Sequence, residues 1–299
     1  MNQNILNAAM KVIDANRLRA ERIAKENKKE ALKLPEFFHA HNDYVASVIE
    51  DAKRGNPSEK TKTLKRALDT LCKKLELGAI EPEYSCPICN DRGIINGKHC
   101  SCLKREINKI LVEQSGFGSL NSFEDAHFEL FENPEYMKKI YEKLQAWCNS
   151  DFKKNMVYLS GGTGTGKTYL LKCMANELIN RGKLTTLVTA YKLNQDFLKS
   201  HASRNLNEKE ALLAQYLDIE VLFIDDLGTE ITAPGITNSY IYALLNERKM
   251  RGLPTVITSN LSLADLTDNY DERITSRIAD ETTIKIFIAG EDLRLKQKN

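Results

Sequence analysis

The segment Gly161–Thr168, GGTGTGKT, constrains the fold of this chain more than any other feature. It follows the apolar run MVYLS and precedes a helical pattern that begins at Lys167. A glycine-rich loop with G-x4-G-K-T spacing between a strand and a helix lets backbone N–H groups surround a phosphate at the helix N-terminus. The sequence therefore predicts an α/β fold with a phosphate-binding loop.

Two residues at the end of this loop carry the expected chemistry. Lys167 can reach the β and γ phosphates of a nucleotide, and the Thr168 hydroxyl is a suitable ligand for Mg²⁺. The remaining cofactor-binding positions are Gly161, Gly162, Thr163, Gly164, Thr165 and Gly166. The alternative is a glycine-rich turn that binds nothing, and the order of strand, loop and helix argues against it.

Such a loop requires a second, acidic element on a neighbouring strand, and VLFIDDLG, Val221–Gly228, provides one. Four apolar residues lead there to two carboxylates. We expect Asp225 to belong to the magnesium shell and Asp226 to orient or deprotonate the attacking water. An apolar strand that ends in Asp is common, so this interpretation depends on the complete loop upstream.

The strand in TVITSN ends in a polar group that we expect beside the γ-phosphate. The expected sheet order places this strand between the phosphate loop and the acidic strand, with Asn260 as a sensor of the γ-phosphate and the water. Polar residues after a strand are also frequent turn formers, so Asn260 is a candidate only because of the two preceding motifs.

Short apolar runs alternate with helical patterns from Asn155 onward. The expected strands are 156–160, 185–189, 221–225, 255–259 and 283–288, and the expected helices are 167–180, 193–200, 208–217, 236–249 and 271–278. Upstream, Asn133 and Pro134 read as the start of another helix, whose apolar stripe we expect to be core. This alternation predicts a parallel α/β sheet of five strands.

The N-terminal part of the chain is rich in charge and poor in strand-forming patterns. Residues 1–80 contain no β-branched runs, and apolar residues recur there at helical spacing on both sides of Gly55–Ser58. We therefore expect helices interrupted at Gly55–Ser58. The alternating charges of residues 17–33 are typical of a solvated helix face.

Over the whole chain 43 basic residues balance 41 acidic ones, so net charge gives no sign of a nucleic-acid partner. No apolar run approaches the roughly 18 residues that a membrane helix requires, and the opening segment lacks the apolar core of a signal peptide. We therefore expect a cytoplasmic protein with no membrane partner.

Four of the seven cysteines lie close together, in CPIC and CSC. Cys86 and Cys89 have the C-x2-C spacing of one half of a tetrahedral zinc site, and Cys100 and Cys102 can provide the other two thiolates. His99 can replace one cysteine, so the fourth ligand is left open. In a reducing compartment these spacings favour a structural Zn²⁺ over disulfides.

Four motifs together resemble an AAA+ ATPase: GGTGTGKT, VLFIDDLG, VITSN and DERITSRI. With CPIC and CSC upstream and SFEDAHFELF between, the chain is similar to the DnaC/DnaI-type bacterial helicase loaders over roughly residues 84–295. The resemblance implies an AAA+ P-loop NTPase that binds ATP or ADP and hydrolyses ATP when protomers self-associate through this domain. It further implies that the protein helps place the hexameric replicative DNA helicase on single-stranded DNA during replication initiation or restart.

Composition, helical periodicity and the cysteine spacing divide the chain into three parts, and the resemblance implies a role for each. Residues 1–83 correspond to a helical partner-binding domain, 84–118 to a zinc-binding module with a linker helix, and 119–299 to the AAA+ ATPase domain. We expect the zinc to be structural and to join the helical region to the ATPase.

Carried over residue by residue, the arginine finger of the family falls on Arg277, where it would act on the ATP of a neighbouring protomer. Arg273 lies on the same helical face, four residues earlier. The alternative is that both arginines form surface ion pairs with Asp271, Glu272 or Asp280.

Two further assignments rest on the resemblance. Arg294, in GEDLR, corresponds to a second sensor of the nucleotide state. The segment Thr189–Arg204 resembles an inserted DNA-contact element, since basic residues supply affinity for phosphates and aromatic rings stack on bases. Its basic and aromatic residues are Tyr191, Lys192, Phe197, Lys199 and Arg204, of which Phe197 can equally be core.

Two other functions remain open. An IstB-type ATPase helper of DNA transposition has a similar ATPase but commonly lacks the zinc cluster and the helical N-terminus, so residues 1–102 favour the loader. The other is a zinc-containing DNA-binding regulator with a vestigial nucleotide site. The intact Lys167, Thr168, Asp225 and Asp226 argue against it, and a nucleotide-binding titration separates the two classes.

Overall fold

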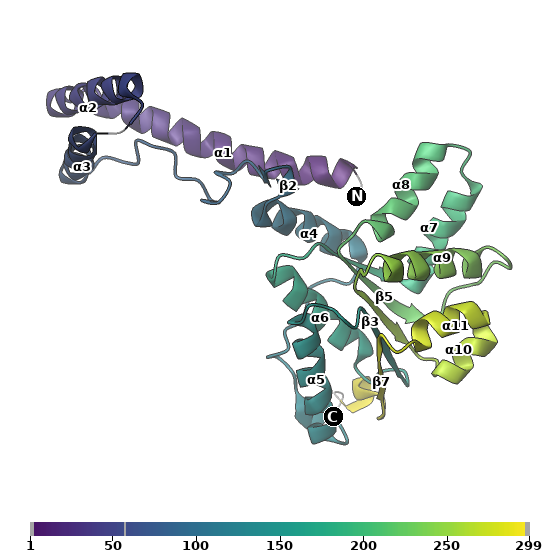
Figure 1. Ribbon diagram of the computed structural model, residues 1–299. Helices are drawn as coiled ribbons and strands as arrows, with labels where there is room; N and C mark the ends of the chain where they lie inside the picture. Colours follow the sequence, from purple (N-terminus) through teal and green to yellow (C-terminus); the bar gives the residue numbers. More distant parts are fainter. Residues whose placement is uncertain (1–2, 57, 297–299) are drawn as a thin grey trace. The chain divides into compact units, whose positions relative to one another are not determined.

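The computed structural model describes residues 3–56 and 58–296 (Figure 1). The chain forms two compact units: Met10–Cys102 is one, and Leu103 onward, with the residues up to Ala9, is the other. We call them the helical unit and the sheet unit. The boundaries after residues 83 and 118 stay a prediction. Within the described residues, no helix is both long and apolar enough to cross a membrane.

Three helices dominate the N-terminal region: α1 (Gln3–Ala31), α2 (Pro35–Arg54) and α3 (Glu59–Lys74). Helix α2 ends at Gly55, whose φ of 81° lies in the left-handed region that glycine adopts most readily. The Ser58 side chain accepts a hydrogen bond from the N–H of Thr61 and so caps α3. The predicted interruption is confirmed for its described residues, and Pro57 lies outside them.

The helical unit also contains a small β-hairpin, formed by β1 (Ile94–Ile95) and β2 (Lys98–His99). Between these strands Asn96 and Gly97 both have positive φ, 49° and 75°, as in a two-residue type I′ turn. Helix α4 (Ser101–Ser115) begins directly after the hairpin. Strands of two residues show no alternating hydrophobicity, so the sequence does not predict them.

The sheet unit is built on five parallel strands, which confirms the predicted fold class. Their spatial order is β4 (Thr185–Thr189), β5 (Val221–Leu227), β6 (Thr255–Ser259), β3 (Met156–Gly161) and β7 (Thr283–Ile288). Strand β6 therefore lies between β3 and β5, as expected. Because parallel strands end at the same edge of a sheet, the phosphate loop, the acidic residues and Asn260 meet there.

Helices cover both faces of this sheet (Figure 1). On one face α5 (Pro134–Cys148) and α6 (Lys167–Asn180) share a core with Val157, Phe223 and Val256 of the strands. On the other face lie α7 (Ala190–Ala202) and α9 (Thr237–Met250). The remaining helical elements are η1 (Phe128–Leu130), α8 (Leu206–Leu217), α10 (Leu263–Asn269), α11 (Glu272–Ala279) and α12 (Leu293–Lys296).

Most predicted elements occur with nearly the predicted bounds, and the exceptions have local causes. Helix α7 begins at Ala190 instead of 193 because the Thr189 side chain caps it by accepting from the N–H of Lys192. Helix α10 is not predicted. It has only seven residues, and a capping box of Ser262 and Asp265 starts it.

Candidate functional site

The glycine-rich loop joins β3 to α6, and its backbone needs glycine. Gly164 and Gly166 have φ values of 76° and 93°, in the left-handed region. A Cβ atom on Gly164 would also collide with the Asp292 carboxylate. The N-terminus of α6, a helix of 14 residues, is thus held at the loop, where its partial positive charge favours an anion.

Lys167 is held at the mouth of this loop by oxygen atoms. Its side chain is almost fully buried, and Nζ donates to the carbonyls of Gly161 and Gly162 at 2.9 and 2.7 Å and to Asn260 Oδ1 at 2.8 Å. Burial lowers the pKa of Lys167, and the negative charges of Asp226 and Asp225 oppose this shift by raising it. The ammonium group therefore links the loop to the end of β6, and phosphate oxygens are stronger acceptors than its carbonyl partners.

Thr168 and Asp225 lie next to each other, as ligands of one magnesium ion must. The Thr168 hydroxyl donates to both oxygens of the Asp225 carboxylate, at 3.1 and 3.0 Å, and the Thr258 hydroxyl donates to Oδ1 at 2.5 Å. Burial raises the pKa of Asp225, an effect that the Thr258 hydrogen bond opposes. Oxygen ligands from a hydroxyl and a carboxylate suit Mg²⁺, so this pair fits a magnesium site.

The acidic strand is longer than predicted because it contains a β-bulge. Strand β5 ends at Leu227 instead of Asp225, and its register with β6 shifts between Ile224 and Leu227. Asp226 has a φ of 56°, and its N–H donates to the Thr258 hydroxyl at 2.9 Å. A bulge changes where successive side chains point. Here Asp225 is buried, while Asp226 lines a pocket beside the loop.

This pocket has a volume of about 330 Å³ and brings together most of the predicted nucleotide-binding residues. On its polar side lie Lys167, Thr168, Asp226 and Asn260. The lining residues that sequence reasoning missed or read only as core are Asp125, His127, Leu130, Phe131, Tyr141, Tyr169 and Leu293. The pocket thus has a polar end at the loop and a partly aromatic wall.

One part of the aromatic wall, Phe131, comes from a segment between α4 and α5 that shows neither helical nor strand periodicity. Phe128 and Phe131 pack edge-on against Tyr141, with ring centroids 5.0 and 6.4 Å apart. The Tyr169 hydroxyl donates to the carbonyl of Asp125 at 2.9 Å and so ties the segment to α6. The available signal was composition, because SFEDAHFELF holds three phenylalanines in ten residues. Flat apolar surfaces of this kind suit the base of a nucleotide.

Arg294 reaches the same pocket from the C-terminal segment. The N–H of Leu293 donates to the carbonyl of Gly164 at 3.0 Å, which places this segment on the phosphate loop. The Arg294 guanidinium pairs with Asp292 at 2.7 Å and is largely exposed. The position of Arg294 is therefore compatible with the predicted contact to the nucleotide.

Arg277 is not among the described residues that line the pocket. It lies on α11, where its Nε donates to Asn246 Oδ1 at 2.9 Å and its guanidinium lies 5.6 Å from the centre of the Tyr242 ring. Arg273 instead pairs with Asp271 at 2.9 Å, as the alternative interpretation expected. The two arginines are thus held differently, and Arg277 is away from the pocket of its own chain.

The predicted DNA-contact segment is only partly available at the surface. Phe197 is buried and stacks on Tyr240, so its alternative assignment to the core is confirmed. Lys192 pairs with the buried Asp196 at 2.5 Å. Tyr191, by contrast, is about half exposed.

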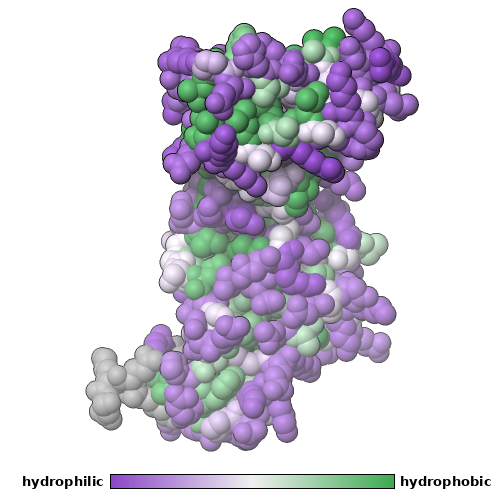
Figure 2. Space-filling view, turned by 90° about the vertical axis from the view of Figure 1, so that its left-hand side faces the viewer, coloured by the Kyte–Doolittle hydropathy of each residue, from purple (hydrophilic) through white to green (hydrophobic). Residues whose placement is uncertain are grey.

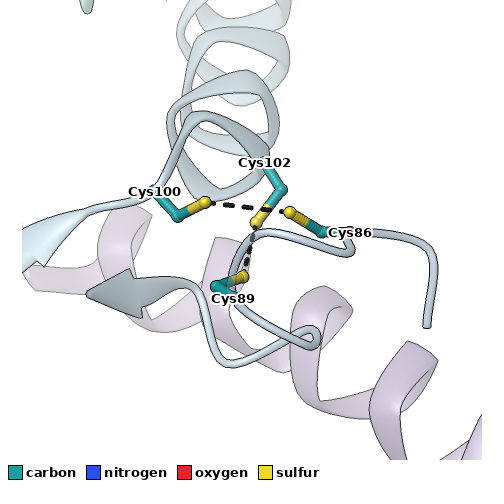
Figure 3. A group of neighbouring side chains, drawn as sticks. All are labelled: Cys86, Cys89, Cys100 and Cys102. Carbon is teal, nitrogen blue, oxygen red and sulfur yellow. Dashed lines mark hydrogen bonds between the residues drawn. The ribbon is translucent and has the colours of Figure 1, made fainter.

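The four clustered cysteines form the second candidate site (Figure 3). Their sulfur atoms all lie within 4.8 Å of one another, with 3.8 Å between Cys86 and Cys100 and 3.4 Å between Cys89 and Cys102. Zinc–sulfur bonds of about 2.3 Å in a tetrahedron separate the sulfurs by about 3.8 Å. The cluster therefore fits a tetrahedral metal. His99 is not part of this group, which favours Cys102 as the fourth ligand.

A buried carboxylate supports this cluster. Asp91 accepts hydrogen bonds from the N–H groups of Ser85 and Cys86, both at 2.8 Å. The N–H of Gly93 donates to Cys89 Sγ at 3.3 Å. Such contacts hold the backbone that carries Cys86 and orient the Cys89 sulfur.

Comparison with known proteins gives three similarities. The chain is 32% identical over 194 residues to the uncharacterized protein YqaM of Bacillus subtilis (strain 168), covering 60% of this chain and 59% of that protein. It is 29% identical over 159 residues to the replicative helicase loader DnaC of Buchnera aphidicola subsp. Baizongia pistaciae (strain Bp), covering 52% and 62%. A crystal structure of DnaI is 28% identical, covers 60% of this chain and 92% of that one, and has a TM-score of 0.47.

The chain spans less than two thirds of the length of either of these two relatives. The model of the family described as IstB-like ATP binding protein matches residues 94–299, more than half of the chain. The matched range contains the phosphate loop, the bulged acidic strand and Asn260. This protein therefore belongs to the IstB-like ATP-binding protein family.

Proposed function

We propose that this protein is an ATPase that loads the replicative DNA helicase onto single-stranded DNA during replication initiation or restart. The ATPase part rests on one observation, a single pocket that is lined by Lys167, Thr168, Asp226 and Asn260. Asp225 lies next to this pocket and accepts a hydrogen bond from the Thr168 hydroxyl. The loader part is supported by the similarity to the helicase loader DnaC, and by the helical unit and cysteine cluster that precede the ATPase.

Each polar residue has one task in this proposal. Lys167 exchanges its carbonyl partners for β- and γ-phosphate oxygens, and the aromatic wall takes the adenine base. Thr168 and Asp225 hold magnesium, which neutralises phosphate charge when bound. Asp226 orients or deprotonates the attacking water, and Asn260 hydrogen-bonds to the water or the γ-phosphate.

Two arginines complete the proposed site. Arg294 contacts the phosphates from within the same chain. Arg277 acts on the ATP of a neighbouring protomer. Its position away from the pocket of its own chain supports this role. ATP hydrolysis then requires self-association through the sheet unit, and the nucleotide state decides whether helicase and DNA stay bound.

The test is co-elution of the full-length protein with the hexameric replicative helicase of its host. We expect a complex when ATP is present, and retention of labelled single-stranded DNA by that complex. The family match favours one other candidate, the IstB-type helper of DNA transposition. ATP-dependent binding to duplex DNA, without any complex with the helicase, would favour this helper and refute the loader.

We assign the contact with the helicase to the helical unit. Helix α2 buries one side, with Phe37 in a core that includes Leu68 of α3. Its other side leaves large apolar residues in solvent, with Phe38 44% and Ile49 52% exposed. Figure 2 shows a hydrophobic area within a hydrophilic surface in the region of α2 and α3. Apolar side chains at helical spacing on an exposed face are typical of a protein-binding surface.

Replacing Phe38 or Ile49 by Asp in the full-length protein should weaken helicase binding by about tenfold or more, because each side chain would be buried in the complex. ATP affinity should not change. Met250→Asp is the control, since Met250 is an even more exposed apolar residue, at 78%, and belongs to the sheet unit. Equal helicase affinity of all three variants and the wild type, measured by biolayer interferometry, would contradict this assignment.

We propose that the cysteine cluster holds one structural Zn²⁺ through Cys86, Cys89, Cys100 and Cys102. Two pairs of thiols come from segments on either side of the hairpin, so the metal would close this part of the chain. All four sulfurs belong to protein ligands, and this leaves no position for a catalytic water.

The full-length protein should therefore purify with about one zinc per chain, measured by atomic emission. Cys86→Ser or Cys89→Ser should lose the zinc and the order of residues 84–105, because zinc binding supplies folding free energy. The nucleotide site should survive. Cys72→Ser, which alters a cysteine of the helical unit outside the cluster, should keep its zinc. Metal-free wild-type protein would refute the assignment.

A further inference from the structure

A buried carboxylate outside the pocket connects the acidic strand to the segment that precedes α11. Glu230 is 7% exposed, and its Oε2 accepts the N–H of Gly228 at 2.9 Å. Its Oε1 accepts the hydroxyl of Tyr270, which is 4% exposed. Gly228 directly follows β5, and Tyr270 directly precedes the residue that caps α11. One side chain thus bonds to both segments.

This arrangement is a poor choice for stability alone. A carboxylate that is buried against neutral donors gives up its hydration, and apolar side chains of similar volume often stabilise a core better. Burial and the charge of Glu230 both raise the pKa of Tyr270, so its hydroxyl stays a hydrogen-bond donor at physiological pH. The two bonds fix the distance between the two segments, whatever they contribute to stability.

On one side, the link begins at the nucleotide pocket. A Cβ atom on Gly228, whose φ is 103°, would lie 2.6 Å from Leu261 Cδ1, so the turn after β5 is packed against the residue after Asn260. The N–H of Leu261 donates to Ser259 Oγ at 3.0 Å, and the Ser259 hydroxyl donates to the carbonyl of Leu227 at 2.5 Å. A shift of the pocket-lining ends of β5 or β6 therefore moves the Gly228 turn.

On the other side, the link ends at α11. Asp271, which follows Tyr270, caps this helix by accepting from the N–H of Ile274 at 3.2 Å. The helix has eight residues and carries Arg277 in its last turn. Because Tyr270 is bonded through the chain to the cap of this short helix, we expect the position of Tyr270 to bear on the position of Arg277.

We propose that Glu230 and Tyr270 are positioning residues that pass the state of the nucleotide site to α11. Occupancy of the pocket then sets where Arg277 is presented to a neighbouring protomer. This proposal rests on the proposed ATP binding. It adds a route, within one chain, from the nucleotide pocket to Arg277. Coupling of this kind requires a physical connection whose position depends on both sites. In this proposal the Glu230 carboxylate is that connection.

Amide hydrogen exchange of the full-length protein, with and without ATP and Mg²⁺, tests the route without relying on hydrolysis. In the wild type, ATP should slow exchange in the phosphate loop, residues 161–168, and also in α11, residues 272–279. Tyr270→Phe removes only the hydroxyl that meets Glu230. In this variant the loop should keep its protection by ATP, and α11 should lose it.

Two further variants separate the route from general damage. Tyr216→Phe makes the same substitution at another buried tyrosine, which donates to the Asp196 carboxylate at 2.6 Å, and it should leave protection of α11 intact. Glu230→Met breaks the link from the other end, because a side chain of similar volume without oxygen accepts neither hydrogen bond. It should cause the same loss as Tyr270→Phe, and the double variant should lose no more than either single one.

The outcomes are distinct. Protection of α11 that persists in Tyr270→Phe and Glu230→Met would overturn the proposal, as would a wild type in which ATP protects the loop but not α11. If Tyr216→Phe also loses the protection of α11, the loss reflects general destabilisation, and this result would overturn the proposal too. A wild type without protection of the loop would overturn the proposed ATP binding, and this inference with it.

Discussion

Lys167→Ala is expected to lower the affinity for ATP by at least about thirtyfold, because removing one partner of a buried, hydrogen-bonded charge pair costs about 2–5 kcal/mol. In the structure the ammonium group is almost fully buried and already points to oxygen atoms, at 2.7–2.9 Å from Gly161, Gly162 and Asn260. A phosphate replaces these acceptors with charged ones. Isothermal titration calorimetry with ATP and Mg²⁺ measures the loss.

The sequence alone predicts that this variant keeps the loop intact, since the side chain points to the ligand. That expectation stays a prediction, and the structure adds a reason to check it, because Lys167 also donates to two carbonyls of the loop. Affinity must therefore be measured where circular dichroism shows the variant folded. Lys172→Ala, on the same helix but away from the pocket, is the matched control and should bind ATP normally. Wild-type affinity in Lys167→Ala would refute the nucleotide site.

The parts of the fold that the sequence predicts well are those with short-range causes. The helix from Lys167 to Asn180 has its predicted bounds because glycine ends the loop and a helical pattern follows at once. The strand from Thr255 to Ser259 also has its predicted bounds, because four β-branched residues follow Pro254 and the polar residues Ser259 and Asn260 end the run. In both cases the neighbouring residues in the chain decide the bounds.

The parts that it misses depend on contacts between distant segments. The bulge at Asp226 is held by the Thr258 hydroxyl, 32 residues away in the chain, and no local pattern announces such a bond. Phe131, in the aromatic wall, packs against Tyr141 of α5, ten residues away. The link from Glu230 to Tyr270 spans 40 residues. Residue types at such positions are visible in the sequence, but their pairing is not.

The choice of ligand at the cysteine cluster illustrates the same limit. Spacing leaves Cys102 and His99 as alternatives, because both flank Cys100 closely enough. The structure separates them, since Cys102 lies in the first turn of α4 and its sulfur comes within 3.4 Å of Cys89. The direction of a side chain follows from the element that carries it, and that element had to be known first.

Arg277→Ala should leave ATP binding by each chain nearly unchanged and abolish hydrolysis. An arginine finger contributes on the order of 10³ to 10⁵ in rate in phosphoryl-transfer systems, because it adds positive charge where negative charge builds up in the transition state. The intrachain bonds of Arg277 to Asn246 and Tyr242 must open before it can reach a neighbour. Arg273→Ala is the matched control, since Arg273 contacts the same Tyr242 ring and is not the proposed finger.

Mixing two inactive variants decides whether Arg277 acts between chains. Lys167→Ala lacks the phosphate-binding lysine, and Arg277→Ala lacks the finger, so a neighbouring pair can form one intact composite site from the loop of the second and the arginine of the first. Steady-state phosphate release should therefore recover in part on mixing. With a finger worth at least about 10³ in rate, even a minority of correctly paired interfaces should exceed the background of either variant. If the mixture stays as inactive as its components, where the wild type assembles and hydrolyses ATP, Arg277 does not act across an interface.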